Sequence, residues 1–156
     1  MQYKLPVSTL VVIYTTDLEV LLLERADHPG SWQSVTGSQE RGESLYETAV
    51  REVFEETGLN ADHYDLMDWQ AQNTYEIYKK WLHRYAPGVL CNTEHVFGLE
   101  LPHILPINLA PREHLKYEWF SWQKAAKCVF SPSNREAILQ LPKRMRSVAA
   151  CKVPKF

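Results

Sequence analysis

The sequence is poor in cysteine and contains no long apolar run. Its three cysteines, Cys91, Cys128 and Cys151, are widely spaced and form no CxxC pair, which argues against a disulfide framework and against a zinc site. The longest apolar run, residues 10–14, is far shorter than the roughly 20 residues that cross a bilayer. No long apolar segment follows the first lysine, so we expect no signal peptide. These features predict a cytoplasmic protein with reduced thiols and no membrane partner.

Excess positive charge is also lacking. The 156 residues hold 17 Lys and Arg against 19 Asp and Glu, a net charge of −2, so we expect no nucleic-acid partner. The imbalance is local, because six glutamates and two arginines between Gly37 and Gly58 make that window −4. The length fits one domain, which we assign to residues 1–142. Residues 143–156 form a basic tail that we expect to be a solvated end.

The order of secondary structure can be predicted from apolar patterns and capping signals. Ser44 and Glu47 have capping-box spacing and predict a helix that begins at Ser44 and ends at Gly58. Ser133 and Glu136 repeat this spacing before a second helix. The predicted strands cover residues 6–14, 20–23, 32–36, 66–81 (with a bend), 95–101 and 115–120. This order favours an α/β or α+β domain with helices packed on a mixed sheet.

The first predicted helix carries three acids on one edge. Glu55 and Glu56 lie three and four residues after Glu52, and like charges at these spacings destabilise a helix by a few tenths of a kcal/mol per pair. The last two also lie near the helix C-terminus, where the helix dipole disfavours negative charge. A solvated acidic face is one interpretation, but it leaves this costly arrangement unexplained. A hard divalent cation such as Mg²⁺, which prefers oxygen ligands, explains it directly.

The loop before this helix has the spacing of a phosphate-binding Walker A loop. Residues 37–44 read GSQERGES, with Glu43 at the position of the lysine. That lysine pairs with phosphate oxygens, which a carboxylate would repel, so we reject a P-loop.

The same segment resembles the sequence box of the Nudix hydrolases. Gly37, five residues, Glu43, seven residues and then REVFEETGL over residues 51–59 match the box at nine positions within 23 residues. The resemblance implies an α/β/α sandwich around a mixed sheet, with a loop-helix-loop that binds Mg²⁺, or Mn²⁺ as an alternative. It also implies hydrolysis of a nucleoside diphosphate linked to another group.

Roles for the box residues follow from the resemblance. Glu52, Glu55 and Glu56 would be metal ligands or activate water, and Arg51 would orient these glutamates. Glu43 would brace the loop, Gly37 would permit a tight backbone near the metal, and Gly58 would end the helix.

Other segments resemble a bacterial branch of the family that acts on a pterin triphosphate in the folate pathway. They lie at residues 4–8, 32–37, 83–89 and 133–135, and the similarity runs from about Lys4 to about Leu141. A further metal carboxylate of this branch matches Glu113. Its substrate-contacting positions match Lys4, Arg25, Thr36, Tyr75, Glu76, Ile77, Tyr78 and Ser131. Tyr75 and Tyr78 stand where we expect phenylalanines, a change that preserves ring stacking.

Each of these residues also has a simpler interpretation. Lys4 and Arg25 could be surface bases, although a triphosphate near an acidic helix needs positive partners. Tyr75 and Tyr78 could serve packing, although a flat pterin ring needs an aromatic wall. Taken alone, Ser131 would start a helix. Glu113 could be a solvated loop acid, yet its place just before a strand would let it reach back toward the acidic helix.

The resemblance implies a mechanism in which Mg²⁺ held by Glu52, Glu55, Glu56 and Glu113 bridges the phosphates and acidifies a water. The water would split the bond between the first two phosphates and release pyrophosphate, with Glu55 or Glu113 as the base. One alternative is a MutT-like pyrophosphatase acting on dATP or oxidised nucleotides. Another is a non-catalytic Nudix module that only binds its ligand. We expect a monomer or homodimer with a small-molecule triphosphate partner.

Overall fold

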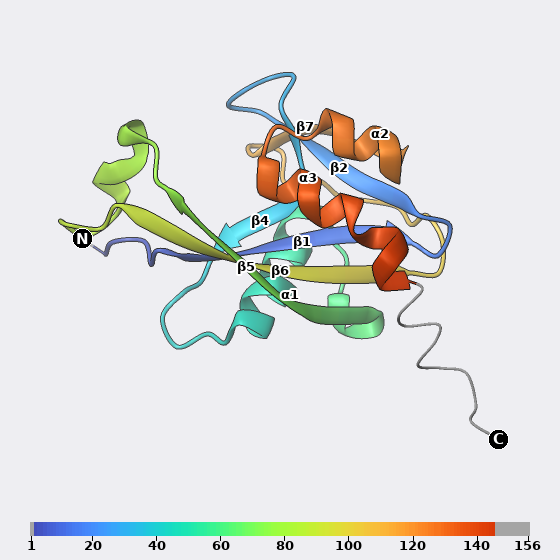
Figure 1. The fold of residues 1–156 in the computed structure, drawn as a ribbon, viewed down its shortest axis with the longest axis horizontal. Coiled ribbons are helices and arrows are strands. Elements are labelled where there is room, and N and C mark those ends of the chain that lie inside the picture. Colours follow the sequence, from blue (N-terminus) through green and yellow to red (C-terminus); the bar gives the residue numbers. More distant parts are fainter. Residues whose placement is uncertain (1, 146–156) are drawn as a thin grey trace.

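The computed structural model describes residues 2–145 as one mixed sheet with helices on both faces. The acidic segment forms α1, and two short helices, α2 and α3, follow the last strand (Figure 1). The elements, with η for 3₁₀ helices, are β1 (Val7–Thr15), β2 (Glu19–Arg25), β3 (Trp32–Gln33), β4 (Val35–Ser38), α1 (Leu45–Thr57), η1 (Ala61–His63), β5 (Asp65–Glu76), η2 (Lys79–Arg84), β6 (Cys91–Leu101), β7 (His114–Ser121), α2 (Trp122–Cys128) and α3 (Pro132–Leu139).

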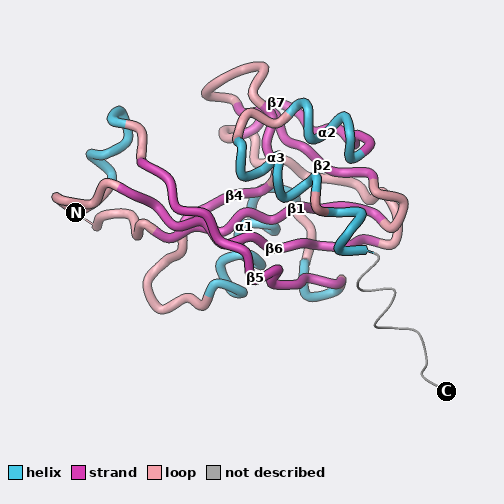
Figure 2. Tube along the Cα trace, viewed as in Figure 1, coloured by secondary structure: helices cyan, strands magenta, loops and turns pink. Residues whose placement is uncertain are grey.

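The centre of the sheet is a parallel pair. β1 and β6 stay in register from Val7 opposite Thr93 to Thr15 opposite Leu101. The strand order of the sheet is β3-β2-β1-β6-β5, and β4 also pairs with β1 and β7 with β2. All strand pairs other than β1–β6 are antiparallel. The predicted mixed sheet is therefore confirmed. β5 and β6 extend beyond the body of the sheet, where η2 connects them near the N-terminus (Figure 2).

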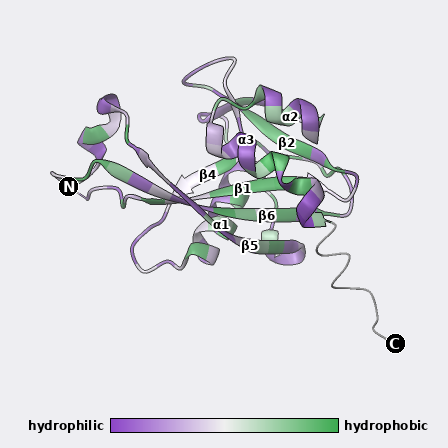
Figure 3. Ribbon diagram, in the orientation of Figure 1, coloured by the Kyte–Doolittle hydropathy of each residue, from purple (hydrophilic) through white to green (hydrophobic). Residues whose placement is uncertain are grey.

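The side chains of β1 alternate between two apolar cores, one on each face of the sheet. Leu10, Val12 and Tyr14 join the core that contains residues of α2 and α3. Val11 and Ile13 join the core that contains residues of α1. Because successive residues of a strand point to opposite faces, α1 covers one face and α2 and α3 cover the other. The expected α/β/α sandwich is confirmed, and its central strands are the hydrophobic ones (Figure 3).

The predicted first helix is confirmed at both ends. The hydroxyl of Ser44 accepts the backbone N–H of Glu47, and the carboxylate of Glu47 accepts that of Ser44. Gly58 ends the helix in the left-handed conformation, at φ 75°.

The predicted start of the last helix is wrong. α3 begins one half-turn earlier, where Ser131 caps it and Pro132 takes the first position, which suits a residue without an N–H. The hydroxyl of Ser133 instead donates to Glu94, at 2.7 Å. The helix α2, capped by Ser121, was not predicted.

Two predicted strands also need correction. The strand expected over residues 32–36 is two strands with different partners, because β3 pairs with β2 whereas β4 pairs with β1. The strand is interrupted at Ser34, whose N–H donates to the side chain of Asn134 instead of to a neighbouring strand. The strand expected over residues 66–81 ends at Glu76 and gives way to η2. Its predicted bend is a bulge near Gln70, at φ 55°.

The end of the chain is described only in part. Residues 141–145 are helical, whereas most of the predicted basic tail, residues 146–156, lies outside the described part of the chain. Within residues 2–145, no helix combines the length and the apolar character that crossing a membrane requires.

Candidate functional site

The apolar packing of α1 decides where its acids lie. Ala49 and Val53 are fully buried against the sheet, and the helical repeat sets Glu52 and Glu56 beside them. Glu56 is consequently only 2% exposed, whereas the side chain of Glu55 is 53% exposed. The helix thus turns two of its three predicted site glutamates inward and leaves the third in solvent.

Arg51 connects the loop before α1 to the acids on the helix. Its guanidinium donates to both oxygens of Glu43, at 2.6 and 2.9 Å, and to the backbone carbonyl of Ser38, at 2.9 Å. It also donates to Glu52, at 2.7 Å, and to Glu55, at 3.4 Å. A planar guanidinium with five donors in fixed directions sets the relative positions of these groups.

Glu43 is the anchor of this loop. Its carboxylate also accepts the Thr48 hydroxyl, at 2.8 Å, and the Glu40 N–H, at 3.0 Å. The hydrogen bonds from Arg51 are the main reason that the pKa of Glu43 falls to about 2. Gly37 lies where the strand β4 meets α1, and a Cβ there would overlap the carboxyl group of Glu52. Close approach of the loop to the acids therefore requires glycine at this position.

Glu52 and Glu56 share an unfavourable environment. Burial raises the pKa of Glu56 well above its usual value, and the nearby Glu52 and Glu113 raise it further. Burial also raises the pKa of Glu52, against the effect of Arg51. One oxygen of Glu56, Oε2, is buried without a hydrogen-bond partner among the described residues. A buried carboxylate with an unpaired oxygen is costly unless a cation compensates it.

Glu113, just before β7, and His114, its first residue, complete the acidic group. An oxygen of Glu56 lies 3.3 Å from Nε2 of His114, at the start of β7. Ligand atoms of Glu56, Glu113 and His114 all lie within 4.8 Å of one another. Burial lowers the pKa of His114 to about 4, so the ring is neutral and can be a ligand. The group fits a divalent cation, because it combines carboxylate oxygens with the unpaired oxygen of Glu56.

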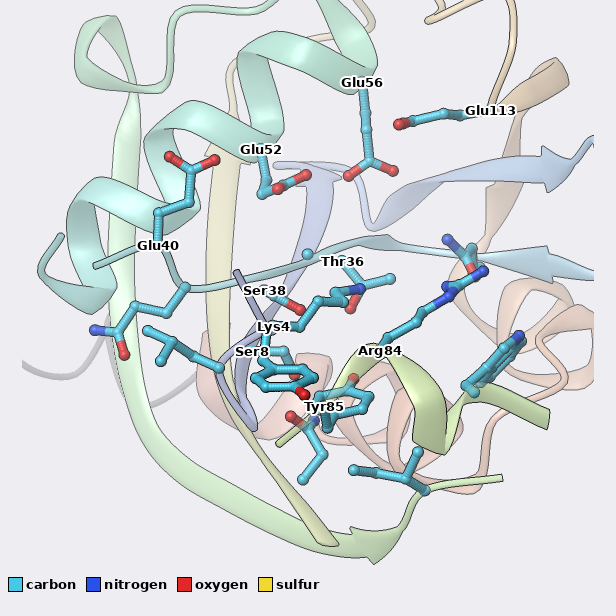
Figure 4. A pocket seen from close by; sticks show the side chains of 18 of the residues that line it. Lys4, Ser8, Thr36, Ser38, Glu40, Glu52, Glu56, Arg84, Tyr85 and Glu113 are labelled. Atoms are coloured by element: carbon cyan, nitrogen blue, oxygen red, sulfur yellow. Dashed lines mark hydrogen bonds between the residues drawn. The ribbon is translucent and has the colours of Figure 1, made fainter. Parts of the chain in front are cut away.

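These acids form one end of an open cavity of about 990 Å³. Figure 4 shows Glu52, Glu56 and Glu113 together at one end, Lys4 and Thr36 between, and Ser8 and Tyr85 at the other end. Other lining residues are Tyr75, Ile77, Tyr78, Trp81 and Asn92. The cavity thus joins an acidic end to an end lined by aromatic and neutral polar side chains, a combination suited to a ligand with a charged part and a flat part.

The cations that line this cavity come from separate elements. Burial is the main cause that lowers the pKa of Lys4, and Arg84 lowers it further. Arg25 is held by both oxygens of Asp27, at 2.6 and 2.7 Å, which raises its pKa. The guanidinium of Arg25 also lies 5.7 Å from the centre of the Trp81 ring, within the range of cation–π attraction. Positive charge therefore borders the aromatic side of the cavity.

Not all of the predicted site residues lie in this cavity. Lys4, Arg25, Thr36, Tyr75, Ile77 and Tyr78 line it, together with Glu52, Glu56 and Glu113. Glu55, Glu76 and Ser131 are not among its lining residues. Glu76 is exposed and alternates along the chain with Tyr75 and Ile77. Ser131 caps α3, the structural interpretation that its sequence position alone favours.

Sequence reasoning missed several buried residues at the site, among them His114 and Asn92. His114 directly follows the predicted Glu113, and this adjacency was a signal that could have found it. Asn92, which is 2% exposed, lies before the predicted strand, which starts at His95, but inside β6 as the structure has it. The run Asn92-Thr93-Glu94 is polar throughout, so the apolar pattern did not show that the strand begins at Cys91.

Known proteins resemble this chain in sequence and in fold. The NUDIX domain model matches residues 4–141. Dihydroneopterin triphosphate diphosphatase of Escherichia coli is 49% identical over 141 residues, which cover 88% of this chain and 93% of the relative. The protein of that name from Haemophilus influenzae is 40% identical over 142 residues, 88% of each chain.

A solved structure agrees with both sequence relatives. The solved structure of the E. coli dihydroneopterin triphosphate pyrophosphohydrolase matches with a TM-score of 0.81 and 48% identity, over 90% of this chain and 97% of that one. These matches cover the fold and the acidic segment alike, and they confirm the resemblance inferred from the box. The chain belongs to the Nudix hydrolase family and is a pyrophosphohydrolase.

Proposed function

We propose that this enzyme hydrolyses dihydroneopterin triphosphate to dihydroneopterin monophosphate and pyrophosphate. The names of the relatives from E. coli and H. influenzae support this substrate. The observation that carries the proposal is the two-ended cavity, with carboxylates at one end and aromatic side chains at the other. A triphosphate with a pterin ring needs both kinds of surface, separated along one cavity.

A divalent cation fits the acidic end. Glu52, Glu56 and Glu113 would hold it from the cavity wall, with Glu55 as the fourth carboxylate on the exposed side of α1. Oxygen ligands favour Mg²⁺, with Mn²⁺ as an alternative that also accepts the nearby imidazole of His114. When bound, the cation would neutralise charge on the phosphate oxygens and acidify a water.

The protein's own groups would position the triphosphate. Arg51 fixes Glu52 relative to the loop, so that the carboxylate does not turn into solvent. Lys4 and Arg25 border the cavity and would attract phosphate oxygens. Arg25 is already oriented by Asp27 and Gln33, which reduces the entropy lost when it binds an anion.

Between the two candidate bases, the structure favours Glu113. Its side chain lines the cavity and lies beside Glu56. Glu55 does not line the cavity, and its carboxylate pairs with Arg51. We therefore propose that an oxygen of Glu113 accepts the proton from the attacking water, because a general base must reach the proton that it removes.

The proposal is tested by pyrophosphate release from a panel of triphosphates. The purified protein with Mg²⁺ should give a much higher kcat/KM for dihydroneopterin triphosphate than for dATP or 8-oxo-dGTP, and EDTA should abolish release. A higher kcat/KM for either nucleotide would overturn the pterin substrate in favour of the MutT-like alternative. Release that persists in EDTA would overturn the role of the cation, and no release from any substrate would favour a ligand-binding module.

A further inference from the structure

The aromatic end of the cavity contains a buried amide with an unused hydrogen-bonding oxygen. Asn92 lies near the start of β6, is 2% exposed and lines the cavity. Its side-chain nitrogen donates to Oγ of Ser8, at 2.8 Å, and to the hydroxyl of Tyr75, at 3.0 Å. Its oxygen, Oδ1, has no hydrogen-bond partner among residues 2–145.

Two hydroxyl groups on neighbouring strands hold this amide in position. An amide nitrogen has two hydrogens, and both are used by partners on neighbouring strands, Ser8 on β1 and Tyr75 on β5. Tyr75 is directly opposite Asn92 in the β5–β6 pair, so the two side chains share one face of the sheet. The oxygen is therefore held at a set position with its lone pairs free.

A buried polar atom without a partner is unusual in a folded protein, and one that borders a cavity points to a ligand that would satisfy it. The labelled neighbour of Asn92, Ser8, lies at the end of the cavity away from Glu56 and Glu113 (Figure 4). If the phosphates lie at the acidic end, as the proposed function requires, the part of the substrate near Asn92 is the ring. The faces of such a ring can stack on tyrosines, but its edge needs in-plane partners.

We infer that Asn92 determines which ring the enzyme accepts, by receiving on Oδ1 a hydrogen bond from an N–H group at the edge of the ring. A pterin carries N–H groups on its edge, so it can satisfy this oxygen. A ring without an N–H would leave the oxygen buried and unpaired, and sites built to bond a substrate N–H discriminate strongly against such rings. This inference rests on the proposed function and assigns its specificity to a residue outside the acidic box.

The test compares a ring-bearing substrate with a ringless one. Asn92→Leu removes the amide at similar volume, and it should lower kcat/KM for dihydroneopterin triphosphate by about ten- to a hundredfold, mainly through KM. The inhibition constant of inorganic tripolyphosphate, which has no ring, should change by less than about twofold, because its binding uses only the phosphate end. Thr93→Val is the matched control, since Thr93 is the next residue of β6 and faces the opposite side, where its hydroxyl contacts the exposed Thr74 hydroxyl. It should leave both constants unchanged.

A second variant keeps the test independent of folding. Tyr75→Phe removes only one hydroxyl that holds the amide, so it should reduce kcat/KM for the pterin substrate in the same direction but less, again without changing tripolyphosphate inhibition. Two results for Asn92→Leu would overturn the inference. One is an unchanged KM for the pterin substrate, and the other is a loss of tripolyphosphate inhibition as large as the loss of kcat/KM for the pterin substrate. A wild-type enzyme that does not hydrolyse dihydroneopterin triphosphate would instead overturn the proposed function.

Discussion

Replacement of Glu43 by glutamine tests whether the loop before α1 is held by charge. In the wild type this carboxylate accepts two hydrogen bonds from Arg51, one from Thr48 and one from the backbone of Glu40. Glutamine has nearly the same size but only one acceptor oxygen, and its NH₂ group would face a donor of the guanidinium. Glu43→Gln should therefore disturb the loop without leaving a cavity.

The size of the effect follows from the pKa of Glu43. The shift from 4.5 to about 2 corresponds to about 3 kcal/mol in full. Because the carboxylate is partly solvated, with 14% of its side chain exposed, we expect a smaller loss of about 2 kcal/mol in the free energy of unfolding. For a domain of this size that loss lowers Tm by about 4–8 °C.

Thermal unfolding followed by circular dichroism at several pH values measures this loss. A depressed pKa stabilises the folded state above pH 4.5, and the contribution disappears as the pH falls toward 2. The difference in Tm between the wild type and Glu43→Gln should thus shrink between pH 6 and pH 3. Glu40→Gln is the control, because Glu40 lies 3.7 Å from the same arginine but is 68% exposed, and it should cost less than about 1 kcal/mol. Equal losses in the two variants would refute the reasoning.

Three further substitutions test other parts of the site. Glu56→Gln should retain the fold but lower kcat by more than the ~10–100-fold that is typical of residues that only orient metal ligands, and near-normal turnover would contradict its assignment. Gly37→Ala should lower kcat with little change in Tm, because the added Cβ displaces the carboxyl group of Glu52; unchanged activity would show that Glu52 need not hold its position. Glu94→Gln should gain stability relative to the wild type as the pH rises from 5 to 8. Burial raises the pKa of Glu94, so the wild type loses stability as the pH rises through that pKa, and a difference in Tm that does not vary with pH would exclude this.

The sequence predicted the elements whose signals are local. The helix α1 has its capping box at Ser44 and a glycine in the left-handed conformation at Gly58, and both are determined by residues within one turn. The acidic box was recognisable for the same reason, since its nine positions lie within 23 residues. Local signals of this kind can be recognised in the sequence without the tertiary structure.

Tertiary contacts decided the features that the sequence did not show. The strand break at Ser34 depends on Asn134, a hundred residues away in the chain. The capping spacing at Ser133 was misleading because its hydroxyl is used by Glu94 across the domain, which leaves Ser131 to cap α3. Asn92 entered the site because β1 and β5 bring Ser8 and Tyr75 to it. The sequence pattern of a single segment does not indicate such tertiary contacts between residues that are far apart in the chain.

The cost of the acidic edge leads to a last prediction. Without a cation, Glu56 is buried with an unpaired oxygen, near Glu52 and Glu113, and the folded state bears this unfavourable charge. A cation that binds only the folded protein must stabilise it, by an amount that grows with concentration as RT ln(1 + [L]/Kd). Millimolar Mg²⁺ should therefore raise the Tm of the wild type in the absence of substrate. Glu56→Gln removes the unpaired charge in advance, so its Tm in EDTA should exceed that of the wild type and its response to Mg²⁺ should be smaller. Equal responses of the two proteins would mean that the buried carboxylate does not bind the ion.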